Sequence, residues 1–159
     1  MHSPVRAGCS CGRQDCPAVA KHPRVRWETL MEAPATEADI EAWWRRWPDA
    51  NVGVVTGRVS GVVVLDVDPR NGGDRLLESF EARWGALPAT VEAHTGGGGR
   101  HLWLSSGEQL PSAVLAPGLE LKAEHAVVTV PPSLHASRGR ACSARGRSRR
   151  DRPSPRWCT

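Results

Sequence analysis

Hydrophobic residues recur at helical spacing near the start of this chain of 159 residues. They follow the i, i+3, i+4, i+7 pattern of a helix face that packs against a core, formed by Ile40, Trp43, Trp44 and Trp47. Thr36 and Asp39 resemble a capping box before this face, and Pro48 ends it. The pattern predicts a helix whose tryptophans belong to the core rather than to a platform on which bases stack.

The rest of the pattern predicts a second helix and several short strands. The helix is expected to begin at Asp74 as its N-cap and to end at Gly85, with an inner face of Leu76, Leu77, Phe80 and Trp84. Short apolar runs predict strands over residues 52–56, 61–68, 90–95, 101–104, 119–122 and 126–130. The turns at 57–60 and 96–100 favour two antiparallel hairpins. The order of elements predicts an α+β domain with a mostly antiparallel sheet.

Residues 136–159 depart from this pattern. They hold eight of the 21 Lys and Arg, a single acid, and no Val, Ile, Leu, Met or Phe. Such a segment buries too little apolar area to offset the entropy of ordering it, so a disordered Arg/Ser-rich tail is expected. Residues 1–135 carry a net charge of −3, so the +4 of the whole chain says little about the partners of the folded part. The tail fits an arginine-rich nucleic-acid arm or, as we favour, the product of a frameshift in a GC-rich gene.

Cysteine and histidine gather near the N-terminus as Cys9, Cys11, Cys16 and His22. The chain contains no apolar run of the roughly 18 residues that a membrane helix needs and no signal-peptide core, so a cytoplasmic protein without a membrane partner is expected. In a reducing compartment, such a cluster indicates a Zn²⁺ site more readily than disulfides. Only one residue separates Cys9 from Cys11, which is tighter than usual for zinc, so a loop of free thiols stays open as the alternative.

Two carboxylates follow the most apolar run, at Asp66 and Asp68. Alternation along a strand places both side chains on one face, where they repel each other unless a cation lies between them. Hard oxygen ligands of this kind suit Mg²⁺ or Mn²⁺. Glu120 and Lys122 likewise share a strand face, so Glu120 is a candidate third ligand and Lys122 a candidate phosphate contact. A solvated strand end and an ordinary exposed strand face remain the alternatives.

Four consecutive glycines, Gly96 to Gly99, precede Arg100 and His101. Without side chains, the backbone N–H groups of Gly97 and Gly98 are able to approach an anion closely. Arg100 and His101 add donors for charge-assisted hydrogen bonds to phosphate oxygens. The alternative is a flexible hairpin loop without a ligand.

Taken together and in this order, these residues resemble the N-terminal domain of bifunctional DNA primase–polymerases, in the archaeo-eukaryotic primase superfamily. The resemblance spans about residues 9 to 137. It rests on Lys21-His22-Pro23, on residues 43–53 and 63–68, on Thr95 to His101, and on Val130-Pro131-Pro132-Ser133.

The resemblance implies an α+β catalytic domain, here over residues 1–135, with an RRM-like sheet. It implies template-dependent nucleotidyl transfer in plasmid, phage or mobile-element replication, with DNA template and primer, nucleoside triphosphates and a replicative helicase as partners. Asp66, Asp68 and Glu120 would be the catalytic acids that hold two metal ions, with Glu120 where the family commonly has Asp. His101 would contact the nucleotide phosphates. We expect the three acids to converge, with His101 facing them across a cleft.

The chain departs from the family pattern in three places. Ala20 stands where Gly usually precedes the Lys-His-Pro stretch. Family members usually have a helix and a strand before the cysteine segment, and aromatic and apolar residues after residue 137, so we expect a fragment that is incomplete at both ends. An inactive remnant, or a nucleic-acid-binding module that uses the cysteine cluster and the basic tail, is the main alternative. A metal-dependent phosphatase would need a nucleophile motif that the sequence lacks.

Overall fold

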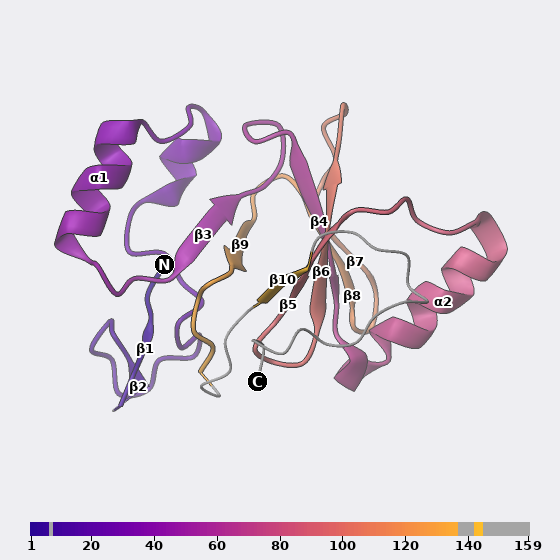
Figure 1. Ribbon diagram of the computed structural model, residues 1–159, viewed down its shortest axis with the longest axis horizontal. Helices are drawn as coiled ribbons and strands as arrows, with labels where there is room; N and C mark the ends of the chain where they lie inside the picture. The colour runs from indigo at the N-terminus through magenta and orange to yellow at the C-terminus, as the bar shows by residue number, and fades with distance from the viewer. Residues whose placement is uncertain (7, 137–141, 145–159) are drawn as a thin grey trace.

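The computed structural model describes residues 1–6 and 8–136 and the backbone of 142–144. In that part of the chain the fold has two units (Figure 1). The larger is a six-stranded sheet in the order β10-β5-β6-β4-β8-β7. Its strands are β4 (Val62–Val67), β5 (Val91–His94), β6 (Arg100–Ser105), β7 (Ala113–Ala116), β8 (Leu119–Lys122) and β10 (Cys142–Ala144).

The smaller unit is a two-stranded sheet of β3 (Val52–Val55) and β9 (Val127–Val130). Helix α1 (Glu37–Arg46) and the 3-10 helix η1 (Trp27–Met31) lie on its outer side, and the hairpin of β1 (Pro4–Val5) and β2 (Gly8–Cys9) lies near its base (Figure 1). All pairings between the named strands are antiparallel. The predicted α+β class with a mostly antiparallel sheet is confirmed.

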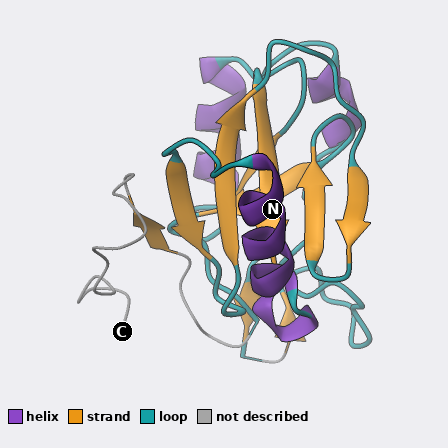
Figure 2. Ribbon diagram, turned by 90° about the vertical axis from the view of Figure 1, so that its right-hand side faces the viewer, coloured by secondary structure: helices purple, strands orange, loops and turns teal. Residues whose placement is uncertain are grey.

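The larger sheet has two covered faces. Helix α2 (Gly73–Trp84) lies over one face, as Figure 2 shows. Leu77 of α2 packs there in a buried cluster with side chains from the three central strands, namely Leu65, Val67, Leu102 and Leu119. Because side chains alternate along a strand, Val64 and Asp66 point to the other face, toward β9. This alternation assigns Leu65 and Val67 to the core under α2 and Asp66 to the space between the two units.

Helix α1 forms as predicted, but its apolar face is not core. Thr36 is the N-cap, and its Oγ1 accepts a hydrogen bond from the Asp39 N–H at 3.2 Å, completing the capping box. No residue of α1 is buried, and Trp44 keeps 39% of its surface exposed. The tryptophans of the helix line an open apolar groove of about 420 Å³, together with residues of β3 and η1, instead of a closed core.

Helix α2 ends at Gly85 as predicted but differs from its prediction at the N-terminal end. The helix begins at Gly73 after Gly72, which adopts a left-handed φ of 79° and provides no side-chain cap, so Asp74 lies in the first turn and is not the N-cap. A carboxylate in this turn still favours the helix dipole. Trp84 is 67% exposed, so it is not part of a buried inner face, and its ring meets Phe80 edge-on and lies under the Arg83 guanidinium.

The predicted hairpin of residues 52–56 with 61–68 is wrong. β3 pairs with β9, whereas β4 lies between β6 and β8. β6 and β8 occupy the two edges of β4, so no edge is left on which β3 could pair. Only the single bridge from Gly57 to Val62 remains of the hairpin.

The other strands form as predicted, with two additions. The hairpin of β5 and β6 is confirmed, as are β8 and β9. β7 lies outside the predicted strands. β10 falls within residues 136–159, where a tail was expected, and pairs with β5 from Cys142 opposite His94. The rest of that tail after Ala136 lies outside the described residues. Among the helices that the structure describes, none is long and apolar enough to cross a membrane.

Two glycines fix the junction between β4, α2 and β8. A Cβ on Gly73 would lie 1.9 Å from the carbonyl oxygen of Gly118. The close approach allows the Gly73 N–H to bond the Asp68 carbonyl at 3.0 Å, and the Asp68 N–H to bond the Gly118 carbonyl at 2.8 Å. The backbone at Asp68 is therefore held from both sides.

Replacing Gly73 with Ala is expected to lower the free energy of unfolding by about 3 kcal/mol, because the methyl group cannot coexist with the Gly118 carbonyl. Gly107→Ala is the matched control, since no atom lies within 4 Å of the place that its methyl group would take, and it should change stability by less than about 1 kcal/mol. Urea unfolding followed by circular dichroism measures both. Equal stabilities for the two variants would contradict the close approach.

Candidate active site

The central strands align three polar side chains in one row. Asp66 on β4 lies directly opposite His101 on β6 and directly opposite Glu120 on β8. Directly opposed residues of antiparallel strands project to the same face. The row therefore stands on the face turned away from α2, where it lines a pocket of about 450 Å³.

Asp68 enters the same pocket from the end of β4. It caps the 3-10 helix η2 (Pro69–Asn71), and its carboxylate accepts two hydrogen bonds from the Arg70 guanidinium, each at 3.0 Å. The hydrogen bonds and charge of Arg70 lower the pKa of Asp68, so this group is ionised at neutral pH. Asp66, Asp68 and Glu120 thus line one cavity, as expected.

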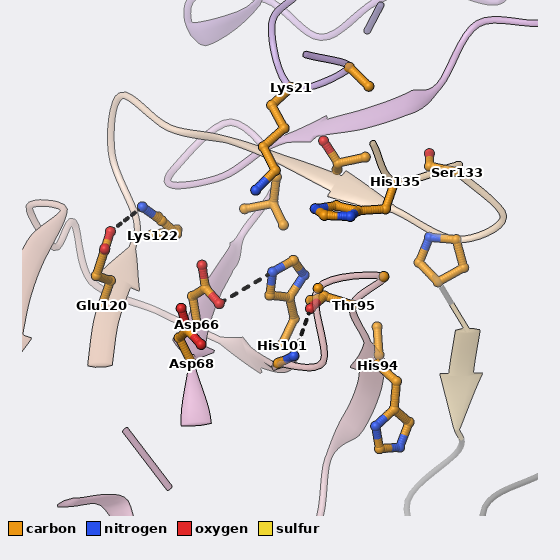
Figure 3. A pocket seen from close by; sticks show the side chains of 18 of the residues that line it. Lys21, Asp66, Asp68, His94, Thr95, His101, Glu120, Lys122, Ser133 and His135 are labelled. Atoms are coloured by element: carbon orange, nitrogen blue, oxygen red, sulfur yellow. Dashed lines mark hydrogen bonds and ion pairs between the residues drawn. The ribbon is translucent and has the colours of Figure 1, made fainter. Parts of the chain in front are cut away.

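His101 lies beside Asp66 and does not face the acids across a cleft. Its Nε2 is 3.5 Å from Asp66 Oδ1, and only 12% of its side chain is exposed (Figure 3). Burial lowers the pKa of His101, although the Asp66 carboxylate opposes this shift. The position follows from the register, because neighbouring strands bring directly opposed residues together on one side of the sheet.

Lys122 lies two residues beyond Glu120 on β8 and forms an ion pair with it (Figure 3). Both side chains line the pocket. A lysine at this place offsets part of the repulsion between Glu120 and Asp66, since it brings a positive charge to the edge of the acidic row.

The glycine loop is a tight turn and not an open one. Thr95 accepts hydrogen bonds from the N–H groups of Gly98 and Gly99, through its carbonyl and its hydroxyl. Gly97 lines the pocket, whereas Gly98 does not. The N–H of Gly98 is already bonded within the turn, so the structure does not bring it toward an anion in the pocket.

Arg100 also lies away from the pocket. Its neighbour His101 points into the pocket, so alternation along β6 turns Arg100 to the opposite face. There its guanidinium lies 3.7 Å from the carboxylate of Glu92, a buried side chain of β5. The sequence predicted a phosphate contact for Arg100, and the structure gives it an ion pair on the other side of the sheet.

A comparison with protein families identifies the family to which the chain belongs. The family of the N-terminal domain of bifunctional DNA primase/polymerases matches residues 4–157. The chain belongs to this Prim-Pol family. Its members are DNA primases and polymerases, nucleotidyltransferases that generally depend on divalent metal ions. No curated protein matches this chain.

The three carboxylates of this Prim-Pol domain fit a divalent cation. Mg²⁺ and Mn²⁺ prefer carboxylate oxygens, and Asp66, Asp68 and Glu120 bring oxygens of three side chains to one open pocket. Like charges gathered in this way are stabilised by a cation among them. The chemistry of these donors suits the divalent ions on which the family generally depends.

Two basic residues of the Prim-Pol pocket were not predicted as site residues. Lys21 reaches in from the segment that follows β2, and His135 from the segment after β9 (Figure 3). Lys21 belongs to the Lys-His-Pro stretch on which the family resemblance rests, but no sequence pattern assigned a function to this residue. His135 lies two residues beyond the Val-Pro-Pro-Ser stretch, and no pattern in the sequence marked it.

The cysteine cluster is brought together as predicted. The ligand atoms of Cys9, Cys11, Cys16 and His22 all lie within 4.8 Å of one another, and the His22 Nε2 is 3.4 Å from Cys9 Sγ and 3.5 Å from Cys16 Sγ. Burial opposes ionisation of Cys9, but hydrogen bonds from the backbone of Ala20 and Cys11 outweigh it and lower its pKa to about 6. The four side chains could hold a metal ion.

Arg100→Ala is expected to destabilise the domain by about 2 kcal/mol, because it takes one cation from the buried Glu92 carboxylate. Nucleotide affinity should not change, since Arg100 faces away from the pocket. Urea unfolding and equilibrium binding of a nucleoside triphosphate measure the two effects, with the exposed Arg75→Ala on α2 as the control. If Arg100→Ala weakened nucleotide binding without changing stability, Arg100 would have to be counted among the nucleotide-binding residues.

Proposed function

We propose that this chain catalyses template-dependent nucleotidyl transfer with Asp66, Asp68 and Glu120 as the acids that hold Mg²⁺ or Mn²⁺. The observation that carries the proposal is the register of β4, which places Asp66 in one row with His101 and Glu120 on a single face. When bound, two such ions activate the primer 3′-oxygen and neutralise charge on the triphosphate. In the overall reaction, that oxygen bonds to the α-phosphorus and pyrophosphate leaves.

The remaining polar groups serve the substrate. His101 and Lys122 donate to phosphate oxygens, and Gly97 lines the same pocket without a side chain that would obstruct an anion. Asp68, which now pairs with Arg70, would help to hold the cation, and the Arg70 guanidinium at the edge of the pocket would be available to phosphate oxygens. His101 is held in place by Asp66, so one carboxylate serves both the ion and the phosphate donor.

The substrates in this proposal are a DNA template with its primer and nucleoside triphosphates. Because the chain belongs to this family, we also propose that it acts in the replication of a plasmid, phage or mobile element, with a helicase as its partner. The competing function is an inactive remnant or a binding module. A nucleotide-binding measurement with and without a divalent cation distinguishes the catalytic function from the competing one. In a remnant whose carboxylates hold no ion, the metal would not increase the affinity for the nucleotide.

Asp66→Asn is expected to reduce primer extension with Mg²⁺ or Mn²⁺ by about 100-fold or more, because it removes a charged ligand at the centre of the row. Glu78→Gln on the exposed face of α2 removes one carboxylate elsewhere and should extend primers like the unmodified protein. Extension of a labelled primer on a DNA template measures both. Near-normal turnover of Asp66→Asn would rule out its catalytic role, provided that both variants unfold at the same urea concentration.

We also propose that Cys9, Cys11, Cys16 and His22 hold one Zn²⁺ ion. A tetrahedral site with ordinary zinc bonds separates its sulfur and nitrogen ligand atoms by roughly 3.5–3.8 Å. The distances from His22 Nε2 to the two nearer sulfurs fall at this value, and the largest separation in the cluster exceeds it by about 1 Å.

Protein purified without chelators should contain about one equivalent of zinc, and Cys11→Ser should lose most of it. Cys158→Ser, outside the described residues, is the matched control and should keep the metal. Elemental analysis by mass spectrometry gives the stoichiometry. Less than about a tenth of an equivalent in the unmodified protein would favour free thiols.

A further inference from the structure

The pocket has two chemically different ends. The acidic row of Asp66, Asp68 and Glu120 occupies one end, on the larger sheet. Lys21 and His135 occupy the other, on segments that belong to the smaller unit (Figure 3). His101 lies between them, close enough to Lys21 for the lysine charge to help lower the pKa of His101. A ligand that fills this pocket meets cation-binding groups at one end and cationic groups at the other.

The basic end is a cluster rather than a set of separate residues. Burial and the charges of Lys21 and Arg70 lower the pKa of His135. A methyl group placed on Gly97 would meet His135 Nε2 at 3.6 Å and the Arg70 guanidinium at 3.7 Å, so both lie over the glycine turn. Cations gathered around a turn that lacks side chains provide the surroundings that a phosphate group prefers.

One buried side chain holds the two basic residues in place. Asn51 donates from Nδ2 to the carbonyl of Leu134 at 2.8 Å and to that of Ala20 at 3.4 Å. Its Oδ1 accepts from the Leu134 N–H at 2.9 Å. Asn51 thus ties the residue before Lys21 to the residue before His135, across 83 positions of sequence between Asn51 and Leu134.

The turn at Ala20 directs Lys21 into the pocket. Ala20 is buried and adopts a left-handed φ of 63°, a conformation that a residue with a side chain adopts only when its surroundings require it. Its N–H donates to Cys9 Sγ at 3.5 Å, and its carbonyl accepts from Asn51. The bonds on both sides of the residue fix the backbone direction from which the Lys21 side chain departs.

We propose that Lys21 and His135 bind the β- and γ-phosphates of the incoming nucleoside triphosphate, with Asn51 as the positioning residue for both. This inference rests on the proposed function, in which the α-phosphate reacts at the acidic row. The two outer phosphates then extend toward the opposite end of the pocket, where Lys21 and His135 lie. Lys21 donates from Nζ and His135 from a ring nitrogen, and the glycine turn leaves room for the oxygens between them.

The experiment measures equilibrium binding of dATP and of dAMP in the presence of Mg²⁺, for the full chain and its variants. Lys21→Ala should weaken dATP binding about tenfold or more, because it removes a charged hydrogen bond, and should change dAMP binding by less than about twofold. His135→Ala should act in the same direction. Lys21→Arg should retain most of the affinity, and Arg58→Ala, which removes an exposed cation outside the pocket, should retain all of it.

Steady-state primer extension provides the readout for Asn51. Asn51→Asp keeps the shape and the acceptor but loses the donors to Ala20 and Leu134, so it should raise the KM for dATP several-fold and change kcat by less than about twofold. Should this variant fail to fold, the Lys21 and His135 variants still decide the question, because Lys21 is exposed and its replacement leaves the core intact.

The outcomes separate the two proposals. Unmodified protein that binds no dATP overturns the proposed function and this inference with it. Magnesium-dependent dATP binding that survives both Lys21→Ala and His135→Ala leaves the proposed function standing and overturns the inference. Equal losses for dATP and dAMP also overturn it, because they would place Lys21 and His135 at the α-phosphate or the base.

Discussion

The pairing of β4 with β6 on one edge and β8 on the other determines the rest of this structure. Leu65 and Val67 alternate with Asp66 along β4, so the same six residues supply the core under α2 and the carboxylate of the pocket. A shift of the register by one residue would turn every side chain of β4 to the other face. It would bury Asp66 among Leu77 and Leu119 and turn Leu65 and Val67 toward the pocket, so the hydrophobic core protects the geometry of the acidic row.

A second constraint acts where β4 ends. The backbone of Asp68 is held by Gly73 and Gly118 through approaches that leave no space for a Cβ on either glycine. This is the reason that α2 begins at Gly73, after a left-handed Gly72, and not at Asp74, where capping preferences placed it. Close backbone packing leaves no periodic signal in the sequence. The sequence therefore predicted the helix and its buried Leu77, but not its first residue.

The candidate site likewise contains residues that a periodic sequence pattern predicts and residues that no such pattern reveals. Asp66 and Glu120 follow apolar strand patterns, and strand alternation was enough to place each on a face. The pairing of β3 with β9 depends on which strand occupies each edge of β4, and short apolar runs do not encode that choice. Arg100 was misassigned because it stands beside His101 in sequence and on the opposite face in space. Lys21 and His135 come from irregular segments, where no period exists to reveal them.

The irregular segment that carries Lys21 also carries His22, and this adjacency joins the cysteine cluster to the pocket. Cys9 accepts from the Ala20 N–H and contacts His22, so it touches the chain on both sides of Lys21. A metal ion held by Cys9, Cys11, Cys16 and His22 would leave the backbone at Lys21 with little freedom. Free thiols would hold it only through weak sulfur hydrogen bonds. The pocket therefore gains its basic end from loops, whereas its acidic end is fixed by the sheet. A metal ion at the cysteine cluster would give these loops the rigidity that the sheet gives to Asp66.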